Sequence, residues 1–235
     1  MDQPTRFPWD QFPDVFIHES ESFVKNHHEY PAAKSGDVLA ARELVEDAIS
    51  PRVLEQLWEC FSDQQPVLIS AHAEEAGGVN AIPEAMTWSI SGVLKWPYEQ
   101  RVIQANKVSH TGASGFARLQ RQAIFSGMLE GGLNYLLVDD FVGQGGTLAN
   151  LRGYILAQGG RVIGATTLTG RDYSARLAPT GAQLLELRRK HGHLESWWCK
   201  RFGCGFDSLT ASETRYLSRT PTVERIIAGL EEIAR

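Results

Sequence analysis

The chain has 235 residues, 43% of them hydrophobic, which suits one α/β domain with additional segments or one domain with a small second one. Its net charge of −5 and the lack of a basic block argue against nucleic-acid binding. No apolar run could span a membrane, and the first residues do not resemble a secretory signal. The three widely spaced cysteines favour free thiols in a reducing compartment, so we expect a cytoplasmic protein.

Residues 1–62 are expected to form a strap and helices that pack on the core. Residues 1–15 are rich in proline and aromatic residues, which favours an extended strap over disorder. A helical stretch follows at 21–35. Asp37 is suited to cap a second helix, and Ser50 with Pro51 provides the N-cap and first position of a third.

Residues 63–172 alternate between strands and helices, which predicts an α/β core with a mostly parallel twisted sheet flanked by helices. Apolar runs predict the strands, and they lie at 66–71, 100–106, 135–138 and 161–168. In such sheets ligands bind beyond the carboxyl ends of the strands. The loops that follow the first three strands can therefore converge on one site.

Residues 173–235 are expected to be helical and to form a hood over the site or a subunit interface. Thr220 and Pro221 are suited to begin the last helix, whose apolar residues recur at helical spacing. This region also holds possible zinc ligands, namely His191, His193, Cys199 and Cys204. Their spacing matches no established zinc pattern, so we expect buried or partly buried thiols instead.

The most informative pattern lies at residues 135–148. Apolar residues 135–138 predict a buried strand, Asp139 and Asp140 stand where it should end, and a glycine-rich turn leads through Thr147 into a helix. Backbone N–H groups at a helix N-terminus favour an anion. The acidic pair requires something else, such as sugar hydroxyls or a hydrated cation. Ribose 5-phosphate satisfies both halves of the pattern.

Other interpretations of this loop fit less well. A dinucleotide-binding motif requires a third glycine where this chain has Leu148, and it follows the first strand of its fold. The spacing from acid to glycines also differs from that of methyltransferases. An ordinary strand-to-helix turn with a solvated acidic pair remains the simplest alternative.

The segment resembles the 5-phosphoribosyl-1-pyrophosphate (PRPP) motif of the type I phosphoribosyltransferases, in which apolar residues precede two acids and a short loop ending in threonine. The resemblance implies that Asp139 and Asp140 hold the ribose 2- and 3-hydroxyls. It further implies that the loop binds the 5-phosphate through Gly143, Gln144, Gly145, Gly146 and Thr147. Phe141 is bulkier than usual. Gly143 stands where the hypoxanthine-guanine branch has a candidate base, so any base must come from elsewhere.

The resemblance assigns roles to the remaining loops as well. The loop after the first strand would contact pyrophosphate through Ala73, Glu74, Glu75, Gly77 and Gly78. Mg²⁺ bound with PRPP would offset the charge of these glutamates, with Glu74, Asp139 and Asp140 as its candidate carboxylates. The next loop would supply a cation and a proton donor or base. Its candidates are Lys107 and His110 as catalytic residues, and Arg118 or Arg121 as further cations. After the fourth strand, Tyr173 could stack on the acceptor and Asp172 could accept from its amino group.

Taken with this resemblance, the sequence predicts a phosphoribosyltransferase. It would transfer ribose 5-phosphate from PRPP to a small nitrogen base and release pyrophosphate, with Mg²⁺ as cofactor. We expect a homo-oligomer, a dimer, without nucleic-acid or membrane partners. Two other classes stay open: a non-catalytic PRPP-binding regulatory module, and a Mg²⁺-dependent hydrolase of a phosphorylated sugar.

Overall fold

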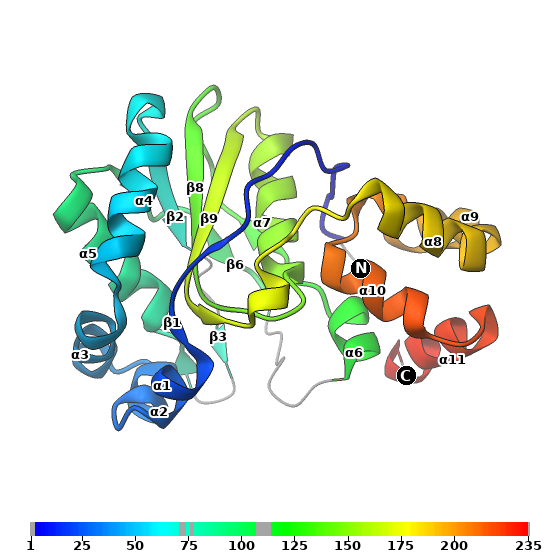
Figure 1. Ribbon diagram of the computed structural model, residues 1–235, viewed down its shortest axis with the longest axis horizontal. Helices are drawn as coiled ribbons and strands as arrows, with labels where there is room; N and C mark the ends of the chain where they lie inside the picture. Colours follow the sequence, from blue (N-terminus) through cyan, green and yellow to red (C-terminus); the bar gives the residue numbers. More distant parts are fainter. Residues whose placement is uncertain (1–2, 71–73, 76–77, 107–113, 235) are drawn as a thin grey trace.

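The computed structural model describes residues 3–70, 74–75, 78–106 and 114–234. Their centre is a five-stranded, all-parallel sheet in the order β1-β9-β8-β2-β5 (Figure 1). The strands are β1 (Phe16–Ser20), β2 (Val67–Ser70), β5 (Tyr98–Glu99), β8 (Asn134–Val142) and β9 (Arg161–Gly170). Helices flank both faces, which confirms the α/β class with a mostly parallel sheet.

Two details of the sheet differ from the sequence prediction. The residues between the expected strap and the first expected helical stretch form the edge strand β1, which pairs with β9. The strand expected at 100–106 is divided: β5 joins the main sheet, whereas β6 (Ile103–Gln104) pairs antiparallel with β7 (Phe125–Ser126). Short strands of this kind carry too few alternating residues for a clear periodic signal.

The strand that carries the acidic pair is also longer than expected. β8 continues through Asp139 and Asp140 to Val142, because β9 runs beside it as far as Gly170. On its other side β2 ends at Ser70, opposite Val138. Both aspartates therefore lie within a strand but beyond the end of its neighbour β2.

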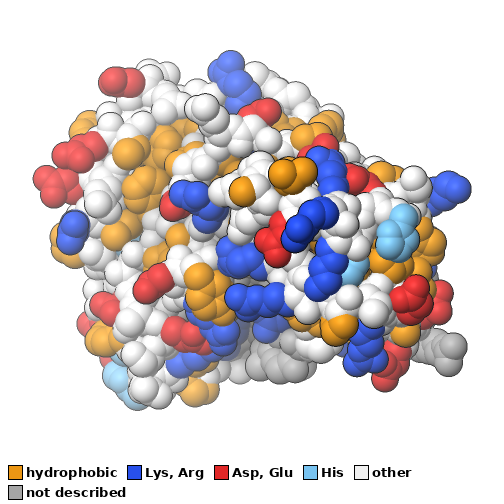
Figure 2. Space-filling view, turned by 45° about the vertical axis from the view of Figure 1, so that its right-hand side comes forward, with side chains coloured by type: hydrophobic (Ala, Val, Ile, Leu, Met, Phe, Trp, Pro, Cys, Tyr) orange, Lys and Arg blue, Asp and Glu red, His pale blue; other side chains and the backbone are white. Residues whose placement is uncertain are grey.

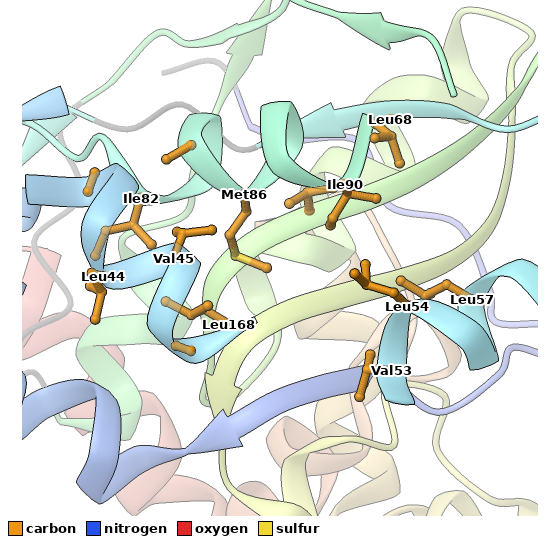
Figure 3. Packing of buried hydrophobic residues seen from close by; sticks show 14 of the residues in the cluster. Leu44, Val45, Val53, Leu54, Leu57, Leu68, Ile82, Met86, Ile90 and Leu168 are labelled. Atoms are coloured by element: carbon orange, nitrogen blue, oxygen red, sulfur yellow. The ribbon is translucent and has the colours of Figure 1, made fainter. Parts of the chain in front are cut away.

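One face of the sheet is covered by helices from the first half of the chain. These are α3 (Val38–Ala48), α4 (Pro51–Phe61) and α5 (Ile82–Leu94). Figure 3 shows their leucine, isoleucine and methionine side chains packed towards Leu68 of β2 and Leu168 of β9. The short helices α1 (Glu21–Asn26) and α2 (Tyr30–Lys34) lie near the edge where the strands end (Figure 1).

The opposite face is covered by α7 (Gly146–Ala157), which packs Leu148, Leu151 and Ile155 against the sheet. Residues 3–15, here called the strap, run across this helix. The guanidinium of Arg152 donates to the carbonyls of Phe7 and Pro8 and lies over the ring of Trp9. These contacts join the strap to α7.

A third apolar cluster joins α6 (Gly115–Gln120) to the C-terminal helices. These are α8 (Gly181–His191), α9 (Glu195–Phe202), α10 (Ala211–Arg219) and α11 (Val223–Ala234), and together with α6 they are called the helical unit. Short 3-10 turns connect the parts of the chain, namely η1 (Ser62–Gln64), η2 (Asp172–Ser174), η3 (Gly192–Leu194) and η4 (Phe206–Ser208). No helix in the described ranges is both long and apolar enough to cross a membrane.

The possible zinc ligands do not gather into a metal site. Nε2 of His191 is buried and donates to the carbonyl of Thr220. Cys199 is exposed, and Cys204 is partly buried, so that burial raises its pKa to about 11. Cys60 is exposed as well. All three thiols are free, but the expected burial holds for Cys204 alone.

Candidate functional site

The strand order places β2 beside β8, and the chain leaves these two strands in different directions. The chain leaves β2 through α5 towards β5, and it leaves β8 through α7 towards β9, on the opposite face. When two neighbouring strands are followed by connections on opposite faces, a gap opens beyond their carboxyl ends, and parallel α/β sheets bind ligands there. The 135–148 segment forms one side of this gap.

A cavity that is open to solvent lies beside the end of β8. Its lining comes from the strap, the α6 region, β8 with its following turn, α7 and α10. The lining residues are Arg6, Arg118, Arg121, Gln122, Ala123, Asp139, Phe141, Gly143, Gln144, Gly145, Gly146, Thr147, Leu148, Asn150 and Glu213. The structure thus brings Asp139, Arg118 and all the loop residues proposed for the phosphate to one cavity.

The turn between β8 and α7 contains a glycine in a left-handed conformation. Gly145 is the N-cap of α7 and has φ of +77°, a left-handed conformation that glycine adopts without strain. A Cβ at this position would also lie 2.5 Å from Cδ2 of Leu177. The amides of the first helical turn have no carbonyl partner within the helix, so those from Gly146 to Leu148 are suited to an anion.

The guanidinium of Arg118 lies beside position 143. A Cβ on Gly143 would lie 2.9 Å from Nη1 of the Arg118 guanidinium. A cation therefore lies next to the loop. Arg121, one turn further along, also lines the cavity. Two arginines and a helix N-terminus together favour a group with more than one negative charge.

A buried network holds this loop from behind. Arg6 of the strap forms two bonds to the carboxylate of Glu213 on α10, at 2.7 and 3.1 Å. Its Nε donates to Oδ1 of Asn150 at 2.5 Å, and its Nη2 donates to the carbonyl of Gly146 at 3.4 Å. Sequence analysis did not identify Arg6 or Glu213.

The same network reaches the loop through α10. The hydroxyl of Thr210 donates to the carbonyl of Gln144 at 2.5 Å, and Glu213 caps the Thr210 amide. This Thr-x-x-Glu capping box is recognisable in the sequence as a helix start. Its second role, in which Glu213 pairs with Arg6, could not be recognised because the two residues are 207 positions apart.

The two aspartates of β8 face opposite sides of the sheet, as consecutive strand residues do. Asp139 lines the cavity, is 8% exposed and accepts a bond from the Asp140 amide at 2.9 Å. Burial and the nearby charge of Asp140 raise the pKa of Asp139 well above its usual value, although Lys34 acts in the opposite direction. Asp140 pairs with Nζ of Lys34 on α2 at 2.9 Å.

The remaining predicted residues lie elsewhere or cannot be placed. Ala73, Gly77, Lys107 and His110 fall outside the described residues. Glu74, Glu75 and Gly78 belong to a small antiparallel hairpin of β3 (Glu74–Glu75) and β4 (Gly78–Val79).

Tyr173 does not line the cavity. It is exposed on η2, where the guanidiniums of Arg171 and Arg215 lie 5.9 and 5.6 Å from its ring centroid. Lys and Arg side chains also gather in the middle of the face drawn in Figure 2.

The chain has two similar curated proteins. Protein TraN of Escherichia coli is 37% identical over 222 residues, which cover 94% of this chain and 50% of TraN. An uncharacterized protein of Haemophilus influenzae is 36% identical over 157 residues, which cover 66% of this chain and 35% of that protein. The chain therefore spans half or less of the length of the curated relatives it matches. No protein-family model matches it.

Solved structures similar to the chain include phosphoribosyltransferases at low identity. The adenine phosphoribosyltransferase of Saccharomyces cerevisiae is 16% identical with a TM-score of 0.37, and the match covers 56% of this chain and 69% of that one. UMP synthase of Leishmania donovani is 16% identical with a TM-score of 0.32, over 77% of this chain and 35% of that one.

Proposed function

We propose that this chain binds PRPP and transfers its ribose 5-phosphate group to a nitrogen base, with release of pyrophosphate. The observation that carries the proposal is the shared cavity of Asp139, Arg118 and the Gly145 turn. It combines a buried carboxylate with a cationic, amide-rich loop only a few residues away. A phosphorylated sugar carries hydroxyls and an anionic phosphate, which are groups that a carboxylate and a cationic, amide-rich loop would bind.

The 5-phosphate is assigned to the turn that begins α7. There the amides from Gly146 to Leu148 and the helix dipole stabilise an anion. Arg118 and Arg121 line the cavity and bring positive charge to this turn. The Thr147 hydroxyl adds a further donor.

The ribose hydroxyls are assigned to Asp139. Two hydroxyl donors would favour its ionised form and offset the burial that raises its pKa. Asp140, fixed by Lys34, contributes negative charge on the other side of β8. Together the carboxylates would stabilise the positive charge that develops on the sugar ring as the bond to pyrophosphate breaks.

The donor set also suits Mg²⁺ bound together with PRPP. Mg²⁺ takes one or two protein carboxylates and completes its shell with water and substrate phosphates. Asp139 offers a buried carboxylate whose charge is opposed by a like-charged neighbour, which a cation would relieve. When bound, the ion would neutralise charge on the departing pyrophosphate. Glu74 as a further ligand, and Lys107 and His110 as catalytic groups, remain predictions, as do the dimer and the hood role of residues 173–235.

One observation favours a second function, in which the chain binds PRPP but does not catalyse a reaction. Position 143 is a glycine and carries no side chain that could act as a base. Such a chain would bind PRPP through the same cavity without turnover.

The decisive experiment mixes the protein with PRPP, Mg²⁺ and a panel of nitrogen bases while pyrophosphate release is followed. Release that requires a base supports the transferase. Binding measured by calorimetry without release supports the module, and release without any base supports a hydrolase. Absence of PRPP binding refutes the proposed site.

The substitution Asp139→Asn tests the role of the carboxylate. PRPP affinity should fall about tenfold or more, because bonds from hydroxyls to a charged acceptor are lost. Thermal stability without ligand should rise at neutral pH. The folded-state pKa of Asp139 is raised, so its ionisation destabilises the fold as pH increases, and asparagine does not ionise. Asp63→Asn, at an exposed position on η1, is the matched control. Unchanged PRPP affinity would place the ribose elsewhere.

A further inference from the structure

Thr167 is a buried residue of β9 whose hydroxyl has no hydrogen-bond partner within the described part of the chain. The residue is 0% exposed, so bulk water does not reach the hydroxyl either. A buried hydroxyl that is left without a partner costs free energy, and native structures contain few of them. The position of Thr167 in the sheet indicates which group its hydroxyl serves.

Thr167 is the neighbour of Asp139 across the sheet. β9 runs parallel to β8, and the register pairs Thr167 directly with Asp139. Neighbouring strands lie about 4.8 Å apart, and residues paired in this way point to the same face. That face also carries Leu137 and Ala165 and is covered by α7. On the other side of β8, β2 ends at Ser70, one position before it would reach Asp139. The lateral neighbour that the sheet gives to this carboxylate is therefore Thr167.

The other neighbours of Thr167 on this face do not serve its hydroxyl. Ile17, its partner on β1, and Ala165, two residues earlier on β9, have apolar side chains. Thr169, two residues later, is polar, but its hydroxyl already donates to the carbonyl of Glu19 at 2.7 Å. The carboxylate on β8 is therefore the acceptor that fits the position of this hydroxyl.

The carboxylate of Asp139 has capacity for this bond. A carboxylate accepts about four hydrogen bonds, and the Asp140 amide donates one of them at 2.9 Å. A threonine hydroxyl changes direction by rotation about a single bond between staggered positions. We propose, on the basis of the proposed function, that the hydroxyl of Thr167 donates to the Asp139 carboxylate and holds it in the orientation that binds the ribose hydroxyls. Thr167 does not line the cavity, so it is a positioning residue that acts through Asp139.

Thr166 provides a matched comparison on the same strand. It is also 0% exposed, but it points to the opposite face, and its hydroxyl donates to the carbonyl of Phe16 at 2.9 Å. That bond joins β9 to β1 and is remote from Asp139. Thr166→Val therefore removes an equally buried hydroxyl without altering the proposed contact.

The experiment measures the affinity for PRPP with Mg²⁺ by calorimetry. Thr167→Val replaces the hydroxyl with a methyl group of similar size, and PRPP affinity should fall about tenfold, as expected when a hydrogen bond to a charged group is lost. Thr167→Ser keeps the hydroxyl and should restore most of the affinity. Thr166→Val should lower thermal stability and leave PRPP affinity unchanged. Wild-type affinity in Thr167→Val, or an equal loss in Thr166→Val, would overturn the inference.

A double-mutant cycle with Asp139→Ala separates positioning from a general effect on the fold. If Thr167 acts through Asp139, Thr167→Val should change PRPP affinity little once Asp139→Ala is present. Equal effects in the two backgrounds would overturn the inference. If the wild-type protein does not bind PRPP, the proposed function fails, and the thermal midpoints of the same four ligand-free proteins decide about the bond. A smaller change by Thr167→Val in Asp139→Ala than in the wild-type protein supports it, and an equal change overturns it.

Discussion

Removal of the Arg6 side chain tests whether the strap and α10 hold the proposed phosphate loop. Both partners of the Arg6–Glu213 pair are almost fully enclosed, with side chains 3% and 1% exposed. Arg6→Met leaves the carboxylate of Glu213 buried with the Thr210 amide as a remaining donor. Breaking one side of a buried ion pair costs about 3–5 kcal/mol.

This energy translates into a large change in thermal unfolding. For a chain of this size, 1 kcal/mol corresponds to about 2–4 °C, so we expect the midpoint to fall by roughly 6–20 °C. Calorimetry or circular dichroism would measure it. PRPP affinity should fall as well, because the Gly146 carbonyl loses its bond to Arg6.

Two further variants make the prediction specific. Arg42→Met removes an exposed pair with Glu46 on α3 and should cost under about 1 kcal/mol. The double variant Arg6→Met with Glu213→Met should be more stable than Arg6→Met alone, because no charge is left unpaired. A destabilisation by Arg6→Met no larger than that of Arg42→Met, or additive effects in the double variant, would refute the reasoning.

Two other substitutions test features away from the cavity. Burial lowers the pKa of His18 from 6.5 to about 4. Below pH 6.5 the unfolded chain therefore binds a proton at His18 that the folded chain does not bind. The free energy of unfolding should fall by about 3 kcal/mol as the pH is lowered from 6.5 to 4. Urea unfolding at pH 7.5 and 4.5 measures this difference in stability. His18→Asn should reduce the difference, whereas His193→Asn, at an exposed position, should leave it unchanged. An equal difference in His18→Asn and the wild-type protein would contradict the role of His18. Gly153→Val would put a Cβ 1.9 Å from the Thr5 carbonyl, so we expect faster proteolysis of the strap and weaker PRPP binding. Gly92→Ala, in open space on α5, is the control, and equal proteolysis of the two variants would count against strap docking on α7.

The elements recovered from sequence are those whose signal is local. Strand β8, the glycine turn and α7 follow from an apolar run, a left-handed position and helical spacing, all within 25 residues. The positions of Asp139 near the end of β8 and of Thr147 at the start of α7 were predictable for the same reason. Strand β1 was missed because its five residues gain their structure from pairing with β9, far along the chain.

The parts of the site that sequence reasoning missed depend on distant contacts. Lys34 looks like an ordinary surface lysine at the end of a short helix, and only the fold brings its amine to Asp140. Arg6 and Glu213 likewise have no local pattern that links them. The orientation of the aspartates towards opposite sides could be inferred from strand alternation, once β8 was known to continue past them.

The bond between Arg6 and Glu213 has a consequence for how the chain folds during synthesis. Contacts between such remote positions form late and slow folding, since a large loop must close first. A nascent chain that has not yet made α10 would already carry the glycine turn, but not the carboxylate that fixes Arg6 behind it. Any property of the cavity that depends on the bonded Arg6 would then arise only after synthesis has passed residue 213.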